Sequence, residues 1–158
     1  MYDLSGRRLH EDSHWDVPKI WDYYEKKEAA EILVLEARDS IQGYIIVYLD
    51  YQGSSAGIRT YVPFLAAAPW NRSFPPAKRQ FANIGRILVA VAVIEGILQY
   101  KDPRLELHSL PDAEEFYRKI KMEETGRSSG EGLKEFRLGK EAGYDLLRFV
   151  LPFMEKDK

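Results

Sequence analysis

Hydrophobic and polar residues follow one another along this chain in a pattern that predicts strands first and a mixture of helices and strands afterwards. Residues 32–37 and 42–49 are rich in β-branched and aromatic side chains, and the turn residues 38–40 between them predict an antiparallel hairpin. Residues 58–67 are predicted to form a further strand. Pro63 must occupy a bulge or an unpaired edge position in it, because proline has no N–H to donate to a ladder.

The clearest helical pattern begins near residue 83. Apolar residues recur there at spacings of three and four as far as Leu98, and other apolar residues fill the remaining faces, which predicts a helix packed on more than one side. Residues 102–103 end it, and 104–108 are a predicted short strand. A second helix is predicted from Pro111 to about Met122, because proline favours the first position of a helix and acidic residues follow it.

The two ends of the chain are predicted to be helical. Residues 126–132 are rich in glycine and serine and predict a loop, followed by a strand at 133–138 and a closing amphipathic helix at 141–154. The apolar side of this closing helix is predicted to hold Leu146, Leu147, Val150 and Leu151. At the other end of the chain, in the first thirty residues, Trp21 and Tyr24 share helical spacing after Pro18, which favours a short helix.

Composition narrows the class of protein. A chain of 158 residues fits a single domain over 1–158 that buries about 70% of the surface of its unfolded form. The net charge of −2 offers no basic surface of the kind that nucleic-acid binding requires. There is no cysteine, which excludes disulfides, thiolate zinc sites and a cysteine nucleophile.

Targeting and membrane signals are not found in the sequence. The acidic N-terminus with Asp3, Glu11 and Asp12 lacks the apolar core of a signal peptide and the basic character of a transit peptide, so we expect a cytoplasmic location. The most apolar stretch, residues 87–98, is well short of the ~20 residues needed to cross a bilayer, so we expect no membrane association.

One loop has the chemistry of a phosphate site. Residues 80–86 read Gln80-Phe81-Ala82-Asn83-Ile84-Gly85-Arg86 and open the helix that begins near Asn83. A helix N-terminus offers unpaired backbone N–H groups and about half a positive charge, which favours pyrophosphate. Small residues keep the backbone accessible, and asparagine tolerates a left-handed conformation better than most residues. An ordinary strand-to-helix turn can share these features.

With this loop the chain resembles the GNAT superfamily of acyl-CoA-dependent N-acetyltransferases. The superfamily pattern of Gln or Arg, two residues, Gly, one residue, then Gly or Ala falls on Gln80, Asn83 and Gly85, with asparagine in place of the first glycine. The resemblance implies an α/β (α+β) fold with a mixed, mostly antiparallel, splayed sheet and helices on both faces. It also implies that the amides of residues 81–86 hold the pyrophosphate of acetyl-CoA and that Leu65, Ala66, Ala67 and Ala68 pair with its pantetheine arm.

Tyr117 is the candidate proton donor. When an amine attacks a thioester, the departing thiolate gains from a hydroxyl beside it, and a tyrosine stays protonated at neutral pH. The superfamily commonly has a Phe-Tyr pair in this helix, which Phe116-Tyr117 matches. The alternative is structural, because Ala113, Phe116, Tyr117 and Ile120 form an apolar helical stripe.

The general base is less evident. Many members of the superfamily place a glutamate on the strand before the loop, whereas residues 60–66 offer no carboxylate. Glu106 and His108 share one face of the next strand, and His108 near its end is the candidate base, although a histidine there can equally be a structural hydrogen-bonding residue.

A zinc motif is also present. His10-Glu11-Asp12-Ser13-His14 spells H-E-x-x-H, which works only when both histidines lie on one face of a helix. The turn-forming residues around it do not favour a helix, so we expect no metal site, and a zinc hydrolase using His10, Glu11 and His14 is a remote alternative.

The sequence therefore predicts transfer of an acetyl or other acyl group from CoA to a primary amine of a small molecule or protein in a ternary complex. The first alternative is a GNAT-fold module that binds CoA without turnover. The second treats the aromatic residues Trp15, Trp21, Tyr23 and Tyr24 as an interaction surface for a second copy of the chain or another protein. The region 1–30 looks short for a GNAT protein, and it is where the acceptor pocket would be shaped.

Overall fold

The computed structural model describes residues 16–68, 71 and 83–154. Its elements follow the mixed order that the sequence predicts. They are α1 (Val17–Glu25), β1 (Ala30–Ala37), β2 (Ser40–Tyr48), β3 (Tyr61–Ala67), α2 (Ile84–Tyr100), β4 (Leu105–Ser109), a 3-10 turn η3 (Pro111–Ala113), α3 (Glu114–Lys119), β5 (Glu123–Ser128), β6 (Lys134–Leu138) and α4 (Lys140–Met154).

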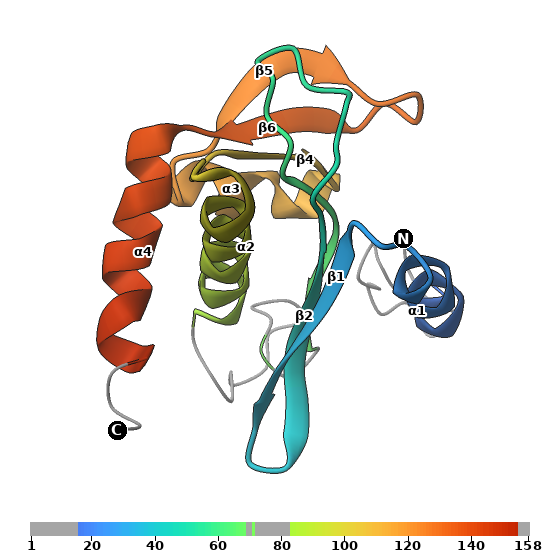
Figure 1. Ribbon diagram of the computed structural model, residues 1–158, viewed down its shortest axis with the longest axis vertical. Coiled ribbons are helices and arrows are strands. Elements are labelled where there is room, and N and C mark those ends of the chain that lie inside the picture. The colour runs from blue at the N-terminus through green and yellow to red at the C-terminus, as the bar shows by residue number, and fades with distance from the viewer. Residues whose placement is uncertain (1–15, 69–70, 72–82, 155–158) are drawn as a thin grey trace.

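A six-stranded sheet with the order β1-β2-β3-β4-β6-β5 organises the fold. Only β3 and β4 pair in parallel, and the other neighbours are antiparallel, which confirms the predicted mixed sheet. Figure 1 shows α2 and α4 on one side of the sheet and α1 on the other, with β1 and β2 running down the picture and β5 and β6 across its top. The sheet is therefore strongly twisted between its two halves.

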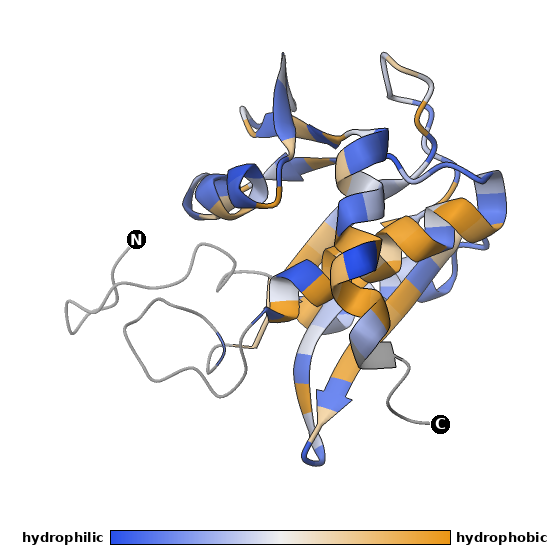
Figure 2. Cartoon of the chain, turned by 90° about the vertical axis from the view of Figure 1, so that its left-hand side faces the viewer, coloured by the Kyte–Doolittle hydropathy of each residue, from blue (hydrophilic) through white to orange (hydrophobic). Residues whose placement is uncertain are grey.

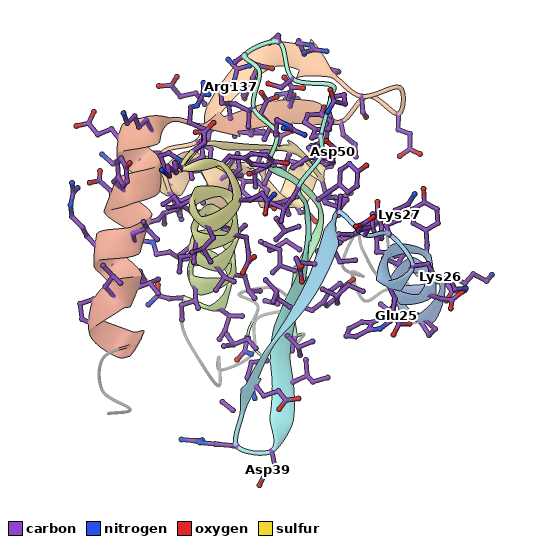
Figure 3. The ribbon with its side chains drawn as sticks, in the orientation of Figure 1. Glu25, Lys26, Lys27, Asp39, Asp50 and Arg137 are labelled. Carbon is purple, nitrogen blue, oxygen red and sulfur yellow. The ribbon has the colours of Figure 1, made fainter. Side chains whose placement is uncertain are left out.

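The β1–β2 hairpin forms as predicted. Its turn consists of Arg38 and Asp39, which both adopt positive φ angles of 51° and 57°, and Figure 3 shows Asp39 at the tip. Two consecutive positive φ angles match the right-handed twist of the flanking strands.

A bulge in β3 lies at Pro63. Tyr61 pairs with Tyr48 and Phe64 with Ile46, so two residues of β3 stand opposite one residue of β2. Of the two positions predicted for Pro63, a bulge or an unpaired edge, the register shows the bulge. Because the extra residue reverses the alternation of side chains, Leu65 packs against the core although it lies an odd number of residues from Val62.

The core lies between the sheet and the pair α2 and α4. Figure 2 shows hydrophobic residues concentrated in the central helices and strands and hydrophilic ones in the surrounding loops. Phe136 of β6 has no exposed surface, and burying such a side chain stabilises a fold by about 1.5–3 kcal/mol. Helix α2 is buried on several faces, as predicted, at Ile84, Leu88, Val89, Ala90, Ala92, Val93 and Gly96.

Several predicted boundaries are wrong. The second helix does not reach Met122, because α3 ends at Lys119 and Lys121 adopts a positive φ of 67° that breaks the helix. The following β5 (Glu123–Ser128) was not predicted at all, and its last three residues overlap the loop predicted at 126–132 from its glycine and serine content. Pairing with β6 makes them a strand.

Two residues assigned to apolar stripes face solvent. Leu98, near the end of α2, is 74% exposed, and Leu151 of α4 is 47% exposed. Both lie in the last turns of their helices, on a side that the described residues leave largely uncovered. Periodicity alone could not show which side stays uncovered.

Helix α1 covers part of the sheet through Tyr24. The ring of Tyr24 packs edge-on against Phe64 of β3, with centroids 5.8 Å apart. Trp21 and Tyr23 are 37% and 58% exposed, and Trp15 lies outside the described residues. Tyr24 thus packs within its own domain, whereas an interaction surface at Trp21 and Tyr23 stays a prediction. No described helix is long and apolar enough to span a membrane.

Gly143 permits the close approach of α4 to the segment before β4. A Cβ atom at Gly143 would lie 2.5 Å from the carbonyl oxygen of Pro103, far inside contact distance. We expect Gly143→Ala to destabilise the protein by about 1–2 kcal/mol, although alanine normally stabilises a helix by about 1 kcal/mol relative to glycine. Urea unfolding measures the change. Gly139→Ala is the matched control, since its Cβ would have open space around it. Equal stability of the two variants would contradict the packing argument.

Candidate functional site

The strands β3 and β4 separate after two parallel pairs. Tyr61 pairs with Glu106 and Val62 with Leu107, and no described pair joins the strands beyond them. The bulge at Pro63 begins at this point, and proline has no N–H with which to continue a ladder. β3 then runs on to Ala67 in register with β2. The sheet consequently opens between the end of β3 and the end of β4.

Three of the four residues predicted to pair with a pantetheine arm line this opening. Leu65, Ala66 and Ala67 belong to the part of β3 that has left β4. The amide of Ala68 instead donates a hydrogen bond to the carbonyl of Gln42, at 2.9 Å, and so is already used. An extended ligand lying along β3 would therefore meet Leu65 to Ala67.

Helix α2 starts at the end of this opening, with Asn83 as its cap. Asn83 has φ 64° and ψ 17°, the left-handed conformation, and its side chain makes no capping hydrogen bond. Glycine and asparagine adopt this conformation most readily. The φ angle is the physical reason why asparagine can stand where the GNAT pattern has glycine. The amides of Ile84, Gly85 and Arg86 follow in the first turn, where no intrahelical acceptor is available.

Gly85 and Arg86 have packing partners of their own. A Cβ atom at Gly85 would lie 2.9 Å from the ring of Phe116, so glycine is needed there for the contact between α2 and α3. The guanidinium of Arg86 lies 4.5 Å from the centre of the Phe149 ring. The predicted loop thus touches the tyrosine helix directly, through Gly85 and Phe116.

Tyr117 lies in the core, on the helix-covered face of the sheet. It is 6% exposed, and its ring contacts those of Phe116 and Phe136 with centroids 5.1 Å and 5.9 Å away. Its hydroxyl makes no hydrogen bond to a described residue. Burial raises the pKa of Tyr117 above the usual value for tyrosine, so its hydroxyl stays protonated at neutral pH.

His108 lies on the opposite face of β4. Leu105 and Leu107 belong to the core, and the alternation of a strand directs Glu106 and His108 to the other side. The Nδ1 atom of His108 lies 2.7 Å from the hydroxyl of Tyr61, within hydrogen-bonding distance. Burial lowers the pKa of His108, which leaves the imidazole neutral at pH 7 and able to accept a proton.

Glu106 is held beneath the loop that joins β2 to β3. Its side chain is fully buried, and Oε1 accepts hydrogen bonds from the Ser54 hydroxyl and from the Arg137 guanidinium, the latter at 3.2 Å and 3.3 Å. Arg137 also donates to the Ser55 hydroxyl at 3.0 Å. Figure 3 shows Arg137 at the top of the molecule beside this loop. Oε2 of Glu106 has no partner among the described residues.

The neighbours of this fold are acetyltransferases. One solved structure, from Desulfovibrio desulfuricans, is assigned as an acetyltransferase of the GNAT family. It matches with a TM-score of 0.56 and 17% identity over 77% of this chain and 76% of that one. Spermidine N-acetyltransferase SpeG of Vibrio cholerae matches with a TM-score of 0.55 and 14% identity over 81% and 74%. A third, assigned as a streptothricin acetyltransferase of Bacillus anthracis in complex with acetyl coenzyme A, has a TM-score of 0.57 and 16% identity over 75% and 67%.

The fold is the GNAT fold. No family model and no curated protein matches the sequence itself. At such low identity the likeness establishes the architecture, while the chemistry has to be argued from the residues of this chain.

In this GNAT fold, the described residues bring most of the predicted site together. The separated end of β3, the cap of α2 and the Phe116-Tyr117 pair are neighbours, whereas His108 lies across the sheet from Tyr117. Gln80, Phe81 and Ala82 lie outside the described residues, as do His10, Glu11 and His14 of the zinc motif. No cluster of metal-binding side chains occurs within the described part of the chain.

Sequence reasoning missed the partners of His108. Tyr61 comes from β3, and Glu135 of β6 stands directly opposite His108 in the antiparallel ladder. The signal was weak but present, since Glu135 and Arg137 alternate with the apolar residues Phe136 and Leu138 along the strand. Only the pairing of β4 with β6 assigns them to His108 and Glu106.

Proposed function

We propose that this protein is an N-acyltransferase that moves an acetyl or other acyl group from CoA to a primary amine by direct attack in a ternary complex. The observation that supports it most is the opening between β3 and β4, which leads to a helix N-terminus capped by left-handed Asn83. An extended thioester cofactor needs free strand backbone beside it and amides for its pyrophosphate. Since the chain has no cysteine, an acyl-cysteine intermediate is excluded.

The cofactor is proposed to be acetyl-CoA. Its pantetheine arm would lie along Leu65 to Ala67, and its pyrophosphate would accept hydrogen bonds from the first-turn amides of α2, together with those of residues 81–83. The positive end of a helix with 17 residues favours the pyrophosphate charge. One neighbour of the same fold is in complex with acetyl coenzyme A.

The two faces of the sheet would divide the chemistry. Tyr117, on the helix-covered face, would donate a hydrogen bond to the departing sulfur, since burial keeps its hydroxyl protonated. His108, on the other face, would accept the proton that the attacking amine loses. An acyl group held in the opening between the strands would be attacked by the amine from one face of the sheet, while the departing sulfur would be stabilised from the other face.

The acceptor is proposed to be a primary amine of a small molecule or of a protein. Neighbours of this fold include enzymes named for spermidine and streptothricin. A panel of n-butylamine, spermidine, an aminoglycoside and a lysine peptide covers these classes. Release of CoA can be followed with a thiol reagent without background, because the protein has no thiol of its own.

Binding of acetyl-CoA should stabilise the fold through Asn83. At about a hundred times its dissociation constant, the ligand is expected to raise the unfolding free energy by about 2.7 kcal/mol, measured as a thermal shift. Asn83→Gly should keep this shift, since glycine adopts the same φ. Asn83→Val should lose most of it, because a β-branched residue in this conformation either strains the cap or moves the amides away from the pyrophosphate.

A second left-handed cap in the same helix supplies the control. Lys101 ends α2 with φ 55° and ψ 29°. Lys101→Val imposes the same backbone strain at the other end of the helix and should lower stability without reducing the ligand-induced shift. Gly85 is unsuitable for this test, since any side chain there meets Phe116. If Asn83→Val and Lys101→Val respond equally to acetyl-CoA, the cap is not the binding site.

A second candidate is a module that binds CoA without turnover. It is favoured by the sequence of β3, Tyr61 to Ala67, which contains no carboxylate to serve as a base. Turnover distinguishes the two: a thermal shift with acetyl-CoA but no release of CoA with any amine of the panel would support the binding module.

A further inference from the structure

A polar cluster fills the sheet face opposite α2, and the function proposed above uses only one of its members. The cluster comes from β3, β4, β5, β6 and the loop between β2 and β3, so residues distant in sequence meet there. Its members are Tyr51, Tyr61, Glu106, His108, Thr125, Glu135 and Arg137.

Both ring nitrogens of His108 are directed at partners. Nδ1 lies 2.7 Å from the hydroxyl of Tyr61, and Nε2 lies 3.7 Å from Oε2 of Glu135. The side chain of Glu135 is 1% exposed, and its other oxygen accepts a hydrogen bond from the Thr125 hydroxyl at 2.8 Å. A carboxylate beside Nε2 favours the tautomer with its proton on Nε2, which leaves the lone pair of Nδ1 for the Tyr61 hydroxyl.

Tyr61 is fixed in place. Its ring stacks on Tyr51, with centroids 4.4 Å apart and planes at 22°, and meets the His108 ring edge-on at 5.7 Å. Burial raises the pKa of Tyr61, with further contributions from Tyr51, Tyr24, Glu135 and Glu106, so its hydroxyl keeps its proton and donates a hydrogen bond to Nδ1.

Charged groups face His108 from three strands. Glu106 on its own strand and Glu135 on β6 raise its pKa, Arg127 on β5 lowers it, and burial, the largest effect, lowers it below the usual value. Arg137 neutralises Glu106 directly. The imidazole is therefore neutral at pH 7 and has a carboxylate positioned to stabilise its protonated form.

The cluster adjoins the point where the sheet opens. Val62 and Leu107 form the last parallel pair before β3 and β4 separate. Tyr61 comes just before Val62, and His108 comes just after Leu107. Because the two nitrogens of His108 are directed at Tyr61 and Glu135, His108 reaches the opening through a partner, and Tyr61 is the partner on the strand that borders the opening.

We propose that Tyr61 is the catalytic residue that receives the proton of the attacking amine, that it passes its own proton to Nδ1 of His108, and that Glu135 is a positioning residue that holds His108 in the required tautomer. This inference rests on the proposed acyl transfer and specifies how that reaction removes a proton.

Each proton that moves in this reaction has a donor and an acceptor. The neutral amine forms an N–C bond with the thioester carbonyl carbon, and the C–S bond then breaks to release the CoA thiolate. The amine nitrogen loses one proton to the oxygen of Tyr61 while the hydroxyl proton of Tyr61 moves to Nδ1. His108 afterwards returns this proton to solvent, and the thiolate takes a proton from Tyr117, which is reprotonated from solvent. The raised pKa of Tyr61 disfavours a phenolate, so its gain and loss of a proton are concerted.

Nitrogen NMR of the labelled full-length protein tests the arrangement without any substrate. The chain has three histidines, so His108→Gln assigns the signals of His108. We expect Nδ1 to be the unprotonated nitrogen at pH 7, with a pKa below that of a free histidine. Tyr61→Phe should shift the Nδ1 signal, and Glu135→Gln should lower the pKa further, because the carboxylate favours the charged ring. A proton on Nδ1 at pH 7 would overturn the relay.

Kinetics with acetyl-CoA and the best amine of the panel give the second test. Tyr61→Phe should lower kcat about tenfold with an unchanged KM for acetyl-CoA, since only the route of the proton is affected. Glu135→Gln should move the acid limb of the kcat profile to lower pH. The controls are Tyr144→Phe, which removes an exposed tyrosine hydroxyl on α4, and Glu131→Gln in the exposed loop before β6.

The outcomes separate the relay from the acyl transfer itself. Full activity of Tyr61→Phe with an unchanged pH profile sinks the relay and leaves the N-acyltransferase standing. Absence of acetyl-CoA binding and of turnover in the unaltered protein overturns the proposed function, and the relay with it.

Discussion

Replacing Tyr117 with phenylalanine is expected to lower kcat about 100-fold and to leave the binding of acetyl-CoA unchanged. The substitution removes one hydroxyl from a side chain that is 6% exposed, and this hydroxyl makes no hydrogen bond to a described residue. If its role is to stabilise the departing thiolate, the loss appears only in the transition state, and general acid catalysis is worth about 10²–10⁴-fold.

Stability distinguishes this role from the structural alternative. A core tyrosine whose hydroxyl has no partner among the described residues should lose little when it becomes phenylalanine, so the free energy of unfolding should stay within about 0.5 kcal/mol of its original value. Tyr144→Phe, on the exposed side of α4, is the control for the loss of a hydroxyl. An unchanged kcat in Tyr117→Phe would mean that Tyr117 is only a core residue, as its place in the apolar helical stripe allows.

The pH dependence of the Tyr117 contribution follows from the sign of its pKa shift. Burial raises the pKa above 10, so the donating, protonated form persists throughout the neutral and moderately alkaline range. Tyr117 should therefore produce no fall in kcat below about pH 10, the reference value for tyrosine. The acid limb, by contrast, belongs to His108, whose lowered pKa places the loss of activity below the pH at which free histidine titrates.

The second large effect is expected on stability, from Arg137→Met. This change leaves the carboxylate of Glu106, which is 0% exposed, without its cation, and breaking a buried ion pair on one side costs about 3–5 kcal/mol. The Arg137 side chain is 29% exposed, so solvent screens part of the pair and we expect a loss of about 2–3 kcal/mol. Urea unfolding at pH 7 measures it.

A double variant identifies the cause. In Glu106→Gln with Arg137→Met, no buried charge is left unpaired, and most of the lost stability should return. Arg148→Met is the control for a surface pair, since Arg148 is 71% exposed and pairs with Asp145, and it should change stability by at most about 0.5 kcal/mol. A double variant as unstable as Arg137→Met would mean that the arginine stem, rather than the charge, provides the stabilisation.

The fold could be predicted from the sequence wherever local chemistry decides the structure. The hairpin, the bulge at Pro63, the long buried helix and the alternation that separates Glu106 and His108 from the core all follow from short-range patterns. The left-handed cap was predicted in the same way, since Asn83 is one of the few residues that tolerates a positive φ.

Elements without such patterns were missed. β5 has polar residues throughout and becomes a strand because β6 supplies hydrogen-bond partners at the edge of the sheet. The end of α3 was placed too late, since the apolar stripe runs on to Ile120, and Ile120 and Met122 are buried although they lie beyond the end of the helix. An apolar stripe in a sequence predicts which residues are buried more reliably than it predicts where the helix ends.

By itself, the sequence determined the order of the elements apart from β5, the opening residues of α2, the Phe116-Tyr117 pair and the absence of any thiol chemistry. These depend on residue type and on contacts a few positions apart. Only the tertiary structure decided that Gly85 touches Phe116, that Tyr117 and His108 lie on opposite faces of the sheet, and that Tyr61 and Glu135 surround His108. Such neighbours come from separate strands, and their meeting depends on strand order and register, which the whole sheet sets cooperatively.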